Sequence, residues 1–372
     1  MAGIVLGNNL LLSVPLCILL LLVLVISTAL LGQWARLQTP GIALCSVMLG
    51  ILVVEMDLSK TGDGKPSRIE RTQQYFLHQR ELLLERLASA GLSDDQYAVV
   101  AAMAMGDKSA LTHELKDTYS KTGASHILAL SGLHLGIIYA LLSMLVVGRR
   151  WQMVSQILII LSIWAFVFLV GMPASVVRSA VTLTVYALLA IGHRHKMSVN
   201  TLAFTAIVML LISPQALFDV GFQMSFMAVF SILLFVPLFY RPLSSEYLMK
   251  HRIVSWIWGM VAVSIAAQIG VAPLIAHYFG RFSCYFLLTN FIVIPAATII
   301  LYLSLCTLLW PAIGTLLACV VGMLNTTLSY IAAIPGATIG DLHPSIMLTA
   351  SLYAVILATY YLLWLTIPQT DR

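Results

Sequence analysis

The chain has 372 residues, of which 60% are hydrophobic and only 9% are charged, and its formal net charge is +5 at pH 7. Soluble domains carry about a quarter charged residues, so this composition excludes a soluble globular protein and predicts an all-α, polytopic helical membrane protein. The five cysteines are dispersed through apolar runs without the paired spacing of a metal site or a disulfide framework.

Apolar runs bounded by polar breaks predict about eleven membrane segments, some of them broken or re-entrant. The first run, Leu10–Leu31, follows no basic segment and precedes no clear small-residue cleavage site, so we interpret it as a retained helix rather than a signal peptide. The predicted segments cover residues 10–31, 42–56, 126–147, 153–171, 175–192, 199–213, 221–240, 253–278, 284–309, 311–334 and 346–367.

Basic residues predict how these segments are oriented. Alternate connections hold most of the arginines and lysines, whereas the opposite short connections hold only Arg281. The positive-inside rule places the basic set in the cytoplasm. An odd number of segments then places the C-terminus in the cytoplasm, the N-terminus outside and residues 57–125 on the outer face. The basic connections contain Arg36, Arg149, Arg150, Arg194, Lys196, Arg241, Lys250 and Arg252.

Residues 57–125 form a sizeable polar stretch. Apolar residues recur at helical spacing in Arg68–Ala90, and Asp94–Met105 and Thr112–Thr122 predict two further short helices. We therefore expect a short extracytoplasmic, mainly helical segment and no five-stranded barrel. Its charges nearly cancel, which argues against a basic nucleic-acid patch. A helical cap packed on the membrane bundle is the favoured interpretation.

A polar cluster lies where the third apolar run begins, and it contains His126, Ser131, Gly132 and His134. Polar groups in hydrocarbon need a cavity or a neighbouring partner. The cluster therefore predicts a break that lines a water-filled space, with Ser131 and His134 facing the bundle interior near Arg178 or Gln223. A close helix–helix contact through Ser131 and Gly132 explains the same residues equally well.

Several more polar residues lie inside or at the entrance of predicted membrane segments. A buried arginine indicates a functional site unless its side chain snorkels to the interface. Two of the amides each precede a proline in successive apolar runs, a pattern typical of broken helices around a transport cavity. For any single amide, hydrogen bonding between helices is the favoured alternative. These residues are Arg178, Asp219, Gln223, Gln268 and Asn290.

The sequence contains no HExxH, Walker A or GxSxG motif. Ser131 and His134 have the residue types of a nucleophile and a base, but no carboxylate is near them in the sequence. We interpret His193 and His195 as part of a basic loop that sets topology rather than as metal ligands. We therefore expect no enzymatic activity, no cofactor and no metal.

A series of short motifs follows in order along residues 92–310. Together they resemble the core of the ComEC competence proteins, the DNA-uptake channels in the inner membrane of transformable bacteria. The Ser-Gly-Leu-His and Gly-Phe-Gln-x-Ser elements are specific in combination. The motifs are Gly106-Asp107-Lys108, Gly123–His134, Arg178 after Pro173, Asn200–Ala203, Ser213-Pro214, Asp219–Ser225, Gln268 with Pro273, and Asn290 with Pro295.

The resemblance implies passage of single-stranded DNA from the outer face to the cytoplasm through a channel in the bacterial inner membrane. Arg178 and Arg281 would then contact phosphates near the outer mouth. Full-length members often carry an OB-like domain and a metallo-β-lactamase-like domain, and we expect a bare channel core without either of them. The implied DNA path contains His126, Ser131, Gly132, His134, Arg178, Asp219, Gln223, Ser225, Gln268, Arg281 and Asn290.

On this interpretation the chain has four regions: N-terminal membrane helices (1–56), the extracytoplasmic segment (57–125), a competence-type channel core (126–310) and C-terminal membrane helices (311–372). The implied partners are single-stranded DNA and membrane lipid, with a DNA receptor, a cytoplasmic helicase and a separate nuclease as further candidates. Two other function classes stay open: a transporter of another anionic solute, and a non-transporting membrane assembly protein.

Overall fold

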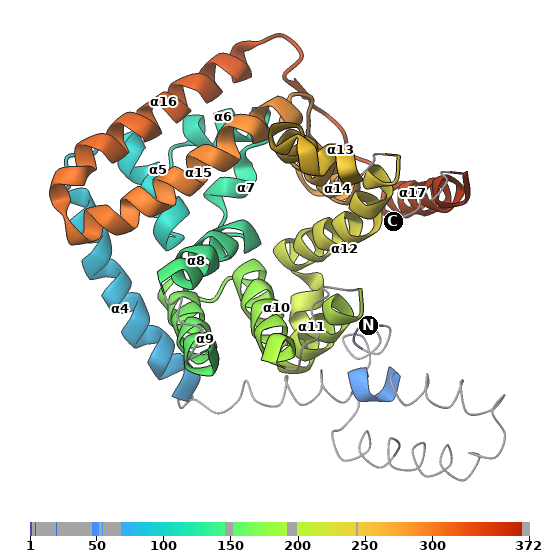
Figure 1. The fold of residues 1–372 in the computed structure, drawn as a ribbon, viewed down its shortest axis with the longest axis horizontal. Coiled ribbons are helices and arrows are strands. Elements are labelled where there is room, and N and C mark those ends of the chain that lie inside the picture. Colours follow the sequence, from blue (N-terminus) through green and yellow to red (C-terminus); the bar gives the residue numbers. More distant parts are fainter. Residues whose placement is uncertain are drawn as a thin grey trace. The chain divides into compact units, whose positions relative to one another are not determined.

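The computed structural model describes residues 68–145, 152–191, 199–242 and 245–366, together with isolated positions before residue 68. In chain order the elements are α4 (Arg68–Ala88), α5 (Asp94–Met105), α6 (His113–Lys121), α7 (Ser125–Leu128), α8 (Gly132–Leu145), α9 (Gln152–Leu169), α10 (Ala174–Ile191), α11 (Val199–Ile212), η2 (Pro214–Phe218), α12 (Val220–Tyr240), α13 (Ser245–Lys250), α14 (Arg252–Phe279), β1 (Phe282–Ser283), α15 (Phe286–Leu309), η3 (Pro311–Ile313), α16 (Gly314–Ala333), β2 (Thr338–Ile339) and α17 (Ile346–Thr366) (Figure 1).

The described helices confirm the all-α class and the multi-pass membrane character. Each predicted segment from residue 126 onward contains one apolar helix, from α8 to α12 and from α14 to α17. Five stretches are long and apolar enough to cross a membrane: α12, α14, α15, η3 with α16, and α17. Helices α8 to α11 are shorter. The segments predicted at 10–31 and 42–56 lie outside the described residues, so the number of eleven stays a prediction.

One predicted segment differs from the structure. Residues 126–147 do not form a continuous helix, because α7 ends at Leu128 and α8 begins at Gly132. The polar cluster identified in the sequence therefore lies at an interruption between two helices. This interruption, residues 129–131, is called the α7–α8 break below.

Helices α4, α5 and α6 occupy the polar stretch, and residues 68–125 contain no strand. A capping box, in which the Ser93 N–H donates to Gln96 Oε1 at 3.0 Å, starts α5. Gly106 ends α5 with a φ of 73°, the left-handed conformation that glycine adopts without strain. Thr112 starts α6 by accepting a hydrogen bond from the Leu115 N–H at 3.2 Å.

The chain divides into two compact units, Met1–Glu70 with Ala203–Gln223, and Arg71–Leu202 with Met224–Arg372. In the second unit the core forms around α5, which is buried from Ala98 to Met105. Apolar side chains of α15 and α16, such as Val293 and Val321, belong to the same core. A helix of the predicted extracytoplasmic segment is therefore covered by helices from the end of the chain, as a packed cap requires.

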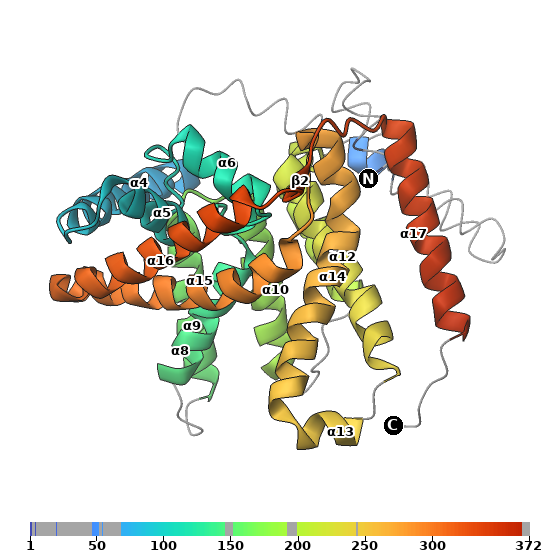
Figure 2. The ribbon, with the colours of Figure 1, turned by 90° about the horizontal axis from the view of Figure 1, so that it is seen from above.

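Helices α15 and α16 run at a steep angle to α14 in the same unit. Figure 1 shows α15 and α16 along their length and α14 nearly end-on, whereas Figure 2 shows α14 and α17 along their length and the α15–α16 pair across them. The antiparallel strands β1 and β2 join the start of α15 to the α16–α17 connection, with Phe282 opposite Ile339. These helices are therefore not a bundle of parallel spans.

Helix α14 packs closely on α12 and α17. A Cβ added at Gly270 would lie 2.5 Å from the carbonyl oxygen of Met227, so only a glycine permits this approach of α14 to α12. The hydroxyl of Tyr353, on α17, donates to the Gly270 carbonyl at 2.8 Å. One glycine thus fixes the spacing of three helices.

Candidate functional site

The α7–α8 break ends in a capping box that begins α8. The Leu133 N–H donates to Ser131 Oγ at 3.3 Å, and the Ser131 N–H donates to Nδ1 of His134 at 3.3 Å. A capping box normally has Glu or Gln at the position that His134 occupies. Because Nδ1 accepts a hydrogen bond, the ring proton lies on Nε2. The first turn of α8 therefore contains no negative charge.

His134 is completely buried. Its Nε2 makes no well-formed hydrogen bond in the described part of the chain, although the Ile127 carbonyl lies nearby. The ring faces the interior, as the sequence predicts.

Gly132 faces α10 at short range. A Cβ at this position would lie 2.6 Å from Ser179 Oγ and 3.1 Å from Arg178 Nη2. Ser175 Oγ, one turn earlier on α10, donates to the Leu130 carbonyl in the break at 2.7 Å. The close approach expected at Gly132 is thus observed, whereas the expectation that Ser131 and His134 lie near Arg178 stays a prediction. Gln223 belongs to the other compact unit, so its relation to His134 stays a prediction.

Arg178 points into the protein rather than to an interface. Only 6% of the surface of this residue is exposed. Nη2 donates to Ser179 Oγ at 3.1 Å, and the guanidinium lies 5.7 Å from the centre of the Phe226 ring. Nε has no hydrogen-bond partner among the described residues. The described chain therefore satisfies this buried cation only in part.

The turn after α5 also reaches the break. A Cβ at Gly106 would lie 2.6 Å from Leu130 Cδ1 and 3.6 Å from the Val170 carbonyl at the end of α9. Asp107 stabilises the turn by accepting a hydrogen bond from the Ser109 N–H at 3.0 Å. Three motifs that are far apart in the sequence, around Gly106, Ser131 and Arg178, therefore converge at the α7–α8 break.

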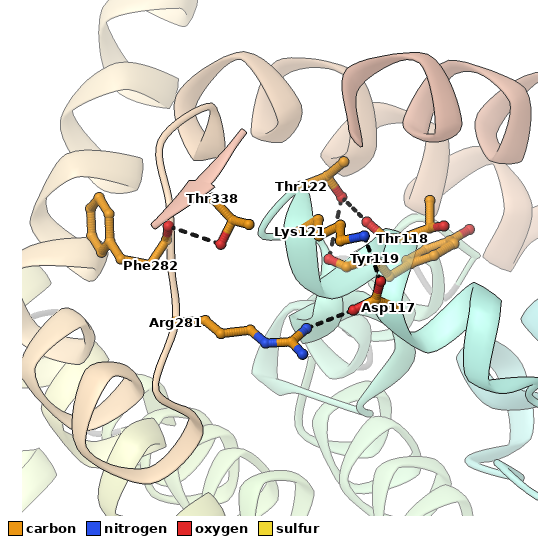
Figure 3. Close-up of polar contacts among 8 residues, drawn as sticks. All are labelled: Asp117, Thr118, Tyr119, Lys121, Thr122, Arg281, Phe282 and Thr338. Carbon is orange, nitrogen blue, oxygen red and sulfur yellow. Dashed lines mark hydrogen bonds and ion pairs between the residues drawn. The ribbon is translucent and has the colours of Figure 1, made fainter. Parts of the chain in front are cut away.

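Arg281 occupies a different environment. Its Nη1 lies 2.6 Å from Asp117 Oδ1 on α6, and Lys121 Nζ lies 2.7 Å from Asp117 Oδ2 (Figure 3). Hydrogen bonds from Lys121 and Arg281 lower the pKa of the Asp117 carboxyl below its usual range. Arg281 is exposed, so a phosphate is able to reach it, but Asp117, which also pairs with Lys121, offsets part of its charge.

The remaining predicted residues are described by their own local contacts. His126 is exposed on α7, with Nδ1 3.0 Å from the Gly123 carbonyl. Asp219 caps α12 by accepting from the Phe222 N–H at 2.7 Å, and Gln223 donates to the Leu217 carbonyl at 3.0 Å. Ser225 and Gln268 are half-buried on α12 and α14. Their place in a DNA path stays a prediction.

Asn290 lies on α15, five residues before Pro295, and is half-buried. Its Oδ1 is buried without a hydrogen-bond partner among the described residues. A buried acceptor of this kind requires water or another donor. This agrees with an amide near a polar space, and its role in a DNA path also stays a prediction.

Sequence reasoning missed Ser179, which accepts a hydrogen bond from Arg178, and Ser175, whose carbonyl accepts one from Ser179. Ser175 and Ser179 lie on the same face of α10 as Arg178, at the spacing of one helical turn. Ser179 Oγ accepts from Arg178 and donates to the Ser175 carbonyl at 2.9 Å. The spacing of these serines from Arg178 is visible in the sequence and could have indicated hydrogen-bond partners for the arginine. Phe226 carried no signal, because a phenylalanine in an apolar helix is indistinguishable from an ordinary core or lipid-facing residue.

Comparison with known proteins agrees with the motifs at the break. The model of the Competence protein family matches residues 103–366, which is more than half of the chain. The chain belongs to the Competence protein family. The match includes the break, α10, and the α15–α16 pair. No solved structure matches the chain.

Three curated relatives match parts of this family member. ComE operon protein 3 of Bacillus subtilis is 31% identical over 209 residues, 56% of the chain and 25% of that protein. An uncharacterized protein of Aquifex aeolicus is 29% identical over 54% of the chain and 45% of its own length. Uncharacterized protein MG316 of Mycoplasma genitalium is 26% identical over 52% of the chain and 47% of its own length. The matches span a quarter to about half of these relatives.

Proposed function

We propose that the protein is a channel through which single-stranded DNA crosses the bacterial inner membrane during natural transformation. Family membership and the similarity to ComE operon protein 3 support a role in competence. The observation that carries the channel assignment is the α7–α8 break, where a 94% buried arginine and a completely buried histidine lie among apolar helices. Buried polar groups in membrane helices usually line paths for substrates or ions.

The break suits an anionic chain rather than a cation. The guanidinium of Arg178, on α10, lies beside Gly132 at the start of α8, where helix backbone N–H groups create partial positive charge. In this proposal the strand enters from the outer face, passes the break and emerges in the cytoplasm beside the C-terminus. A DNA receptor, a cytoplasmic helicase and a separate nuclease are its proposed partners, and the helicase supplies the pulling force.

We also propose that the residues of this chain move the strand and do not hydrolyse it. The described residues contain no group of three or more His, Cys, Asp and Glu side chains arranged to hold a metal ion. Nucleases of the metal-dependent class need such a set to activate water. The strand recovered after transport by the purified protein is therefore expected to keep its full length.

Reconstituted liposomes test the proposal directly. A labelled single strand is added outside, a single-strand-binding protein is enclosed inside as a trap, and external nuclease removes what has not entered. We expect protected label to accumulate only in liposomes that contain the protein. Gly132→Leu is expected to abolish entry, because its side chain would collide with Ser179 and Arg178 and force α8 away from α10. Gly136→Ala is the control, since a Cβ there meets nothing within 4 Å.

Two variants of His134 distinguish a role in transport from a role in packing. His134→Gln preserves the capping box, because glutamine accepts the same backbone N–H, whereas His134→Ala removes it. If the imidazole serves the path, both variants lose entry and only His134→Ala loses stability, by about 1 kcal/mol. If His134 only packs, His134→Gln transports normally. Protection of labelled polyphosphate with no protection of DNA would assign the channel to another anionic solute.

A further inference from the structure

An open groove lies on the surface of the α15–α16 pair. Its volume is about 200 Å³, and it is lined by side chains from residues 292–299 of α15 and residues 320–327 of α16. On α15 the small side chain of Ala296 lies between the larger side chains of Ile292 and Ile299, which share its helix face. The groove therefore forms where one small residue interrupts a row of large ones.

The lining offers no charge and no free hydrogen-bond donor. All of its side chains are apolar except that of Thr327, whose hydroxyl donates to the Met323 carbonyl of its own helix at 2.7 Å. No acidic or basic residue occurs between Arg281 and Asp341, so both helices that form the groove are uncharged along their whole length. A polar ligand would lose its hydration here without compensation. The groove therefore suits an apolar ligand.

One side of the groove belongs to the protein core, and the other side is open. Ala296 and Val320 pack against the core that surrounds α5, whereas Ile299 is 48% exposed and Met323 is 65% exposed. Both helices are in stretches that are long and apolar enough to cross a membrane. Apolar side chains that are exposed on such helices face the hydrocarbon of the bilayer. Acyl chains are therefore the medium into which the groove opens.

The volume of the groove limits what is able to enter it. An apolar cavity of about 150 Å³ holds a benzene molecule. A groove of about 200 Å³ then holds on the order of eight carbon atoms of an acyl chain. An α-helix with its side chains is about 10–12 Å wide, so a helix of a second copy would insert no more than a single side chain. The size favours one acyl chain.

We propose that the groove between α15 and α16 binds one acyl chain of a membrane phospholipid. The acyl chain covers Ala296 and extends the apolar core that these helices form with α5. Met323 adapts to it, because its side chain is flexible and polarizable. Since both helices are uncharged, binding depends on the acyl chain and not on the headgroup. This site does not depend on whether the protein transports DNA.

Photolabelling before and after detergent extraction tests the site. The full chain is reconstituted in nanodiscs with a phosphatidylcholine whose acyl chain carries a diazirine, and one half of the sample is transferred to detergent and washed before illumination. In nanodiscs we expect label on every exposed apolar helix, including α17. After washing we expect label to remain on residues 292–299 and 320–327 and to be lost from α17. Mass spectrometry of the intact washed protein is expected to show one bound phospholipid per chain.

Three leucine variants connect the retained lipid to the groove. Ala296→Leu is expected to lose both the retained label and the bound phospholipid, because its side chain fills the groove. Thr327→Leu fills it from α16 and removes only a hydrogen bond within that helix, so this variant decides if Ala296→Leu does not fold. Ala358→Leu, at an exposed position on α17, is the control and is expected to retain the lipid. Thermal unfolding verifies that each variant is folded.

Equal loss of label from the groove and from α17 would overturn the proposal, because the groove would then contact only bulk lipid. Retained label in folded Ala296→Leu and Thr327→Leu would place the acyl chain elsewhere. An intact mass of two chains without phospholipid would assign the groove to a second copy, and the mass of a fatty acid would assign it to a free acid. Stronger labelling by a phosphatidylglycerol with the same acyl chains would refute a site that ignores the headgroup.

Discussion

Asp117 connects two segments that are 164 residues apart in the sequence, because it accepts hydrogen bonds from Lys121 on its own helix and from Arg281 beside β1. Both partners stabilise the ionised carboxylate, so the pKa of Asp117 is lower in the folded protein than in the unfolded chain. The stabilisation is therefore fully present above the unfolded pKa, near 3.9. It is lost as the pH falls through the lower pKa of the folded state.

We predict that Asp117→Asn lowers stability at pH 7 by about 0.2–1 kcal/mol, the range for exposed ion pairs. The same variant is expected to lose less stability than the unmodified protein when the pH falls from 5 to 2, because it has no carboxylate to protonate there. Thermal unfolding at several pH values measures both effects. Glu85→Gln, at an exposed carboxylate with no ion pair among the described residues, is the control. Parallel pH curves for Asp117→Asn and the unmodified protein would contradict the prediction.

At the scale of single residues, the sequence was most informative at polar residues inside apolar segments, because such residues are costly to place in lipid. Ser131, Gly132, His134 and Arg178 are unsuited to lipid, and the structure brings these four to one place. The same reasoning had no access to the Asp117–Arg281 pair, since each residue alone is an ordinary exposed charge. It also placed Asp219 in the path as a polar residue at the entrance of a membrane segment; the structure shows that this carboxylate caps α12, and its place in the path stays a prediction.

At the element scale, the hydropathy pattern predicted where apolar helices lie but not the directions in which they run. The predicted segments 253–278 and 346–367 agree with α14 and α17 within a residue or two. Apolar runs such as α15 and α16 are equally long, yet they lie across α14 (Figure 2). The direction of a helix depends on its neighbours, here the buried helix α5. Contacts over such sequence distances leave no periodic signal in either segment.

The crossing of α12 and α14 depends on Gly270. We predict that Gly270→Ala destabilises the protein by about 1–3 kcal/mol, because the added methyl group would lie 2.5 Å from a backbone oxygen that cannot rotate away. Gly259→Ala is the control on the same helix, where the nearest atom is the mobile hydroxyl of Tyr240 at 3.2 Å. Thermal unfolding in detergent compares the two. Equal unfolding temperatures for both variants would contradict the prediction, because they would mean that α12 and α14 accommodate the methyl group without loss of stability.

At the scale of the whole molecule, the α15–α16 pair affects the count of membrane crossings. If α14 and α17 cross the bilayer, α15 and α16 extend along its plane (Figure 2). Their packing on α5, in the segment predicted outside, places them towards the outer face. Exposed apolar side chains such as Leu309 and Met323 would then contact lipid. If neither α15 nor α16 crosses the bilayer, the predicted number of crossings falls by two and stays odd. The C-terminus is therefore still predicted on the cytoplasmic side.

We predict that Ala312→Cys, between α15 and α16, and Gly340→Cys, after β2, react with a membrane-impermeant maleimide from the same side of the membrane. The five native cysteines are first replaced. Ala88→Cys on α4 is the control for the outer face, and Met249→Cys on α13 is the control for the cytoplasmic face; both positions are exposed. Labelling of Ala312→Cys only after the membrane is permeabilised would mean that α15 crosses the bilayer.

Positions 132 and 179 share one small volume, although 47 residues separate them. A substitution that enlarges one of these side chains disturbs the packing of α8 on α10 unless the other side chain becomes smaller. The two positions are therefore expected to evolve together. Among diverging descendants of this chain, the two positions therefore change as correlated pairs, and their correlation records the approach of α8 to α10 even in lineages where the overall sequence similarity has faded.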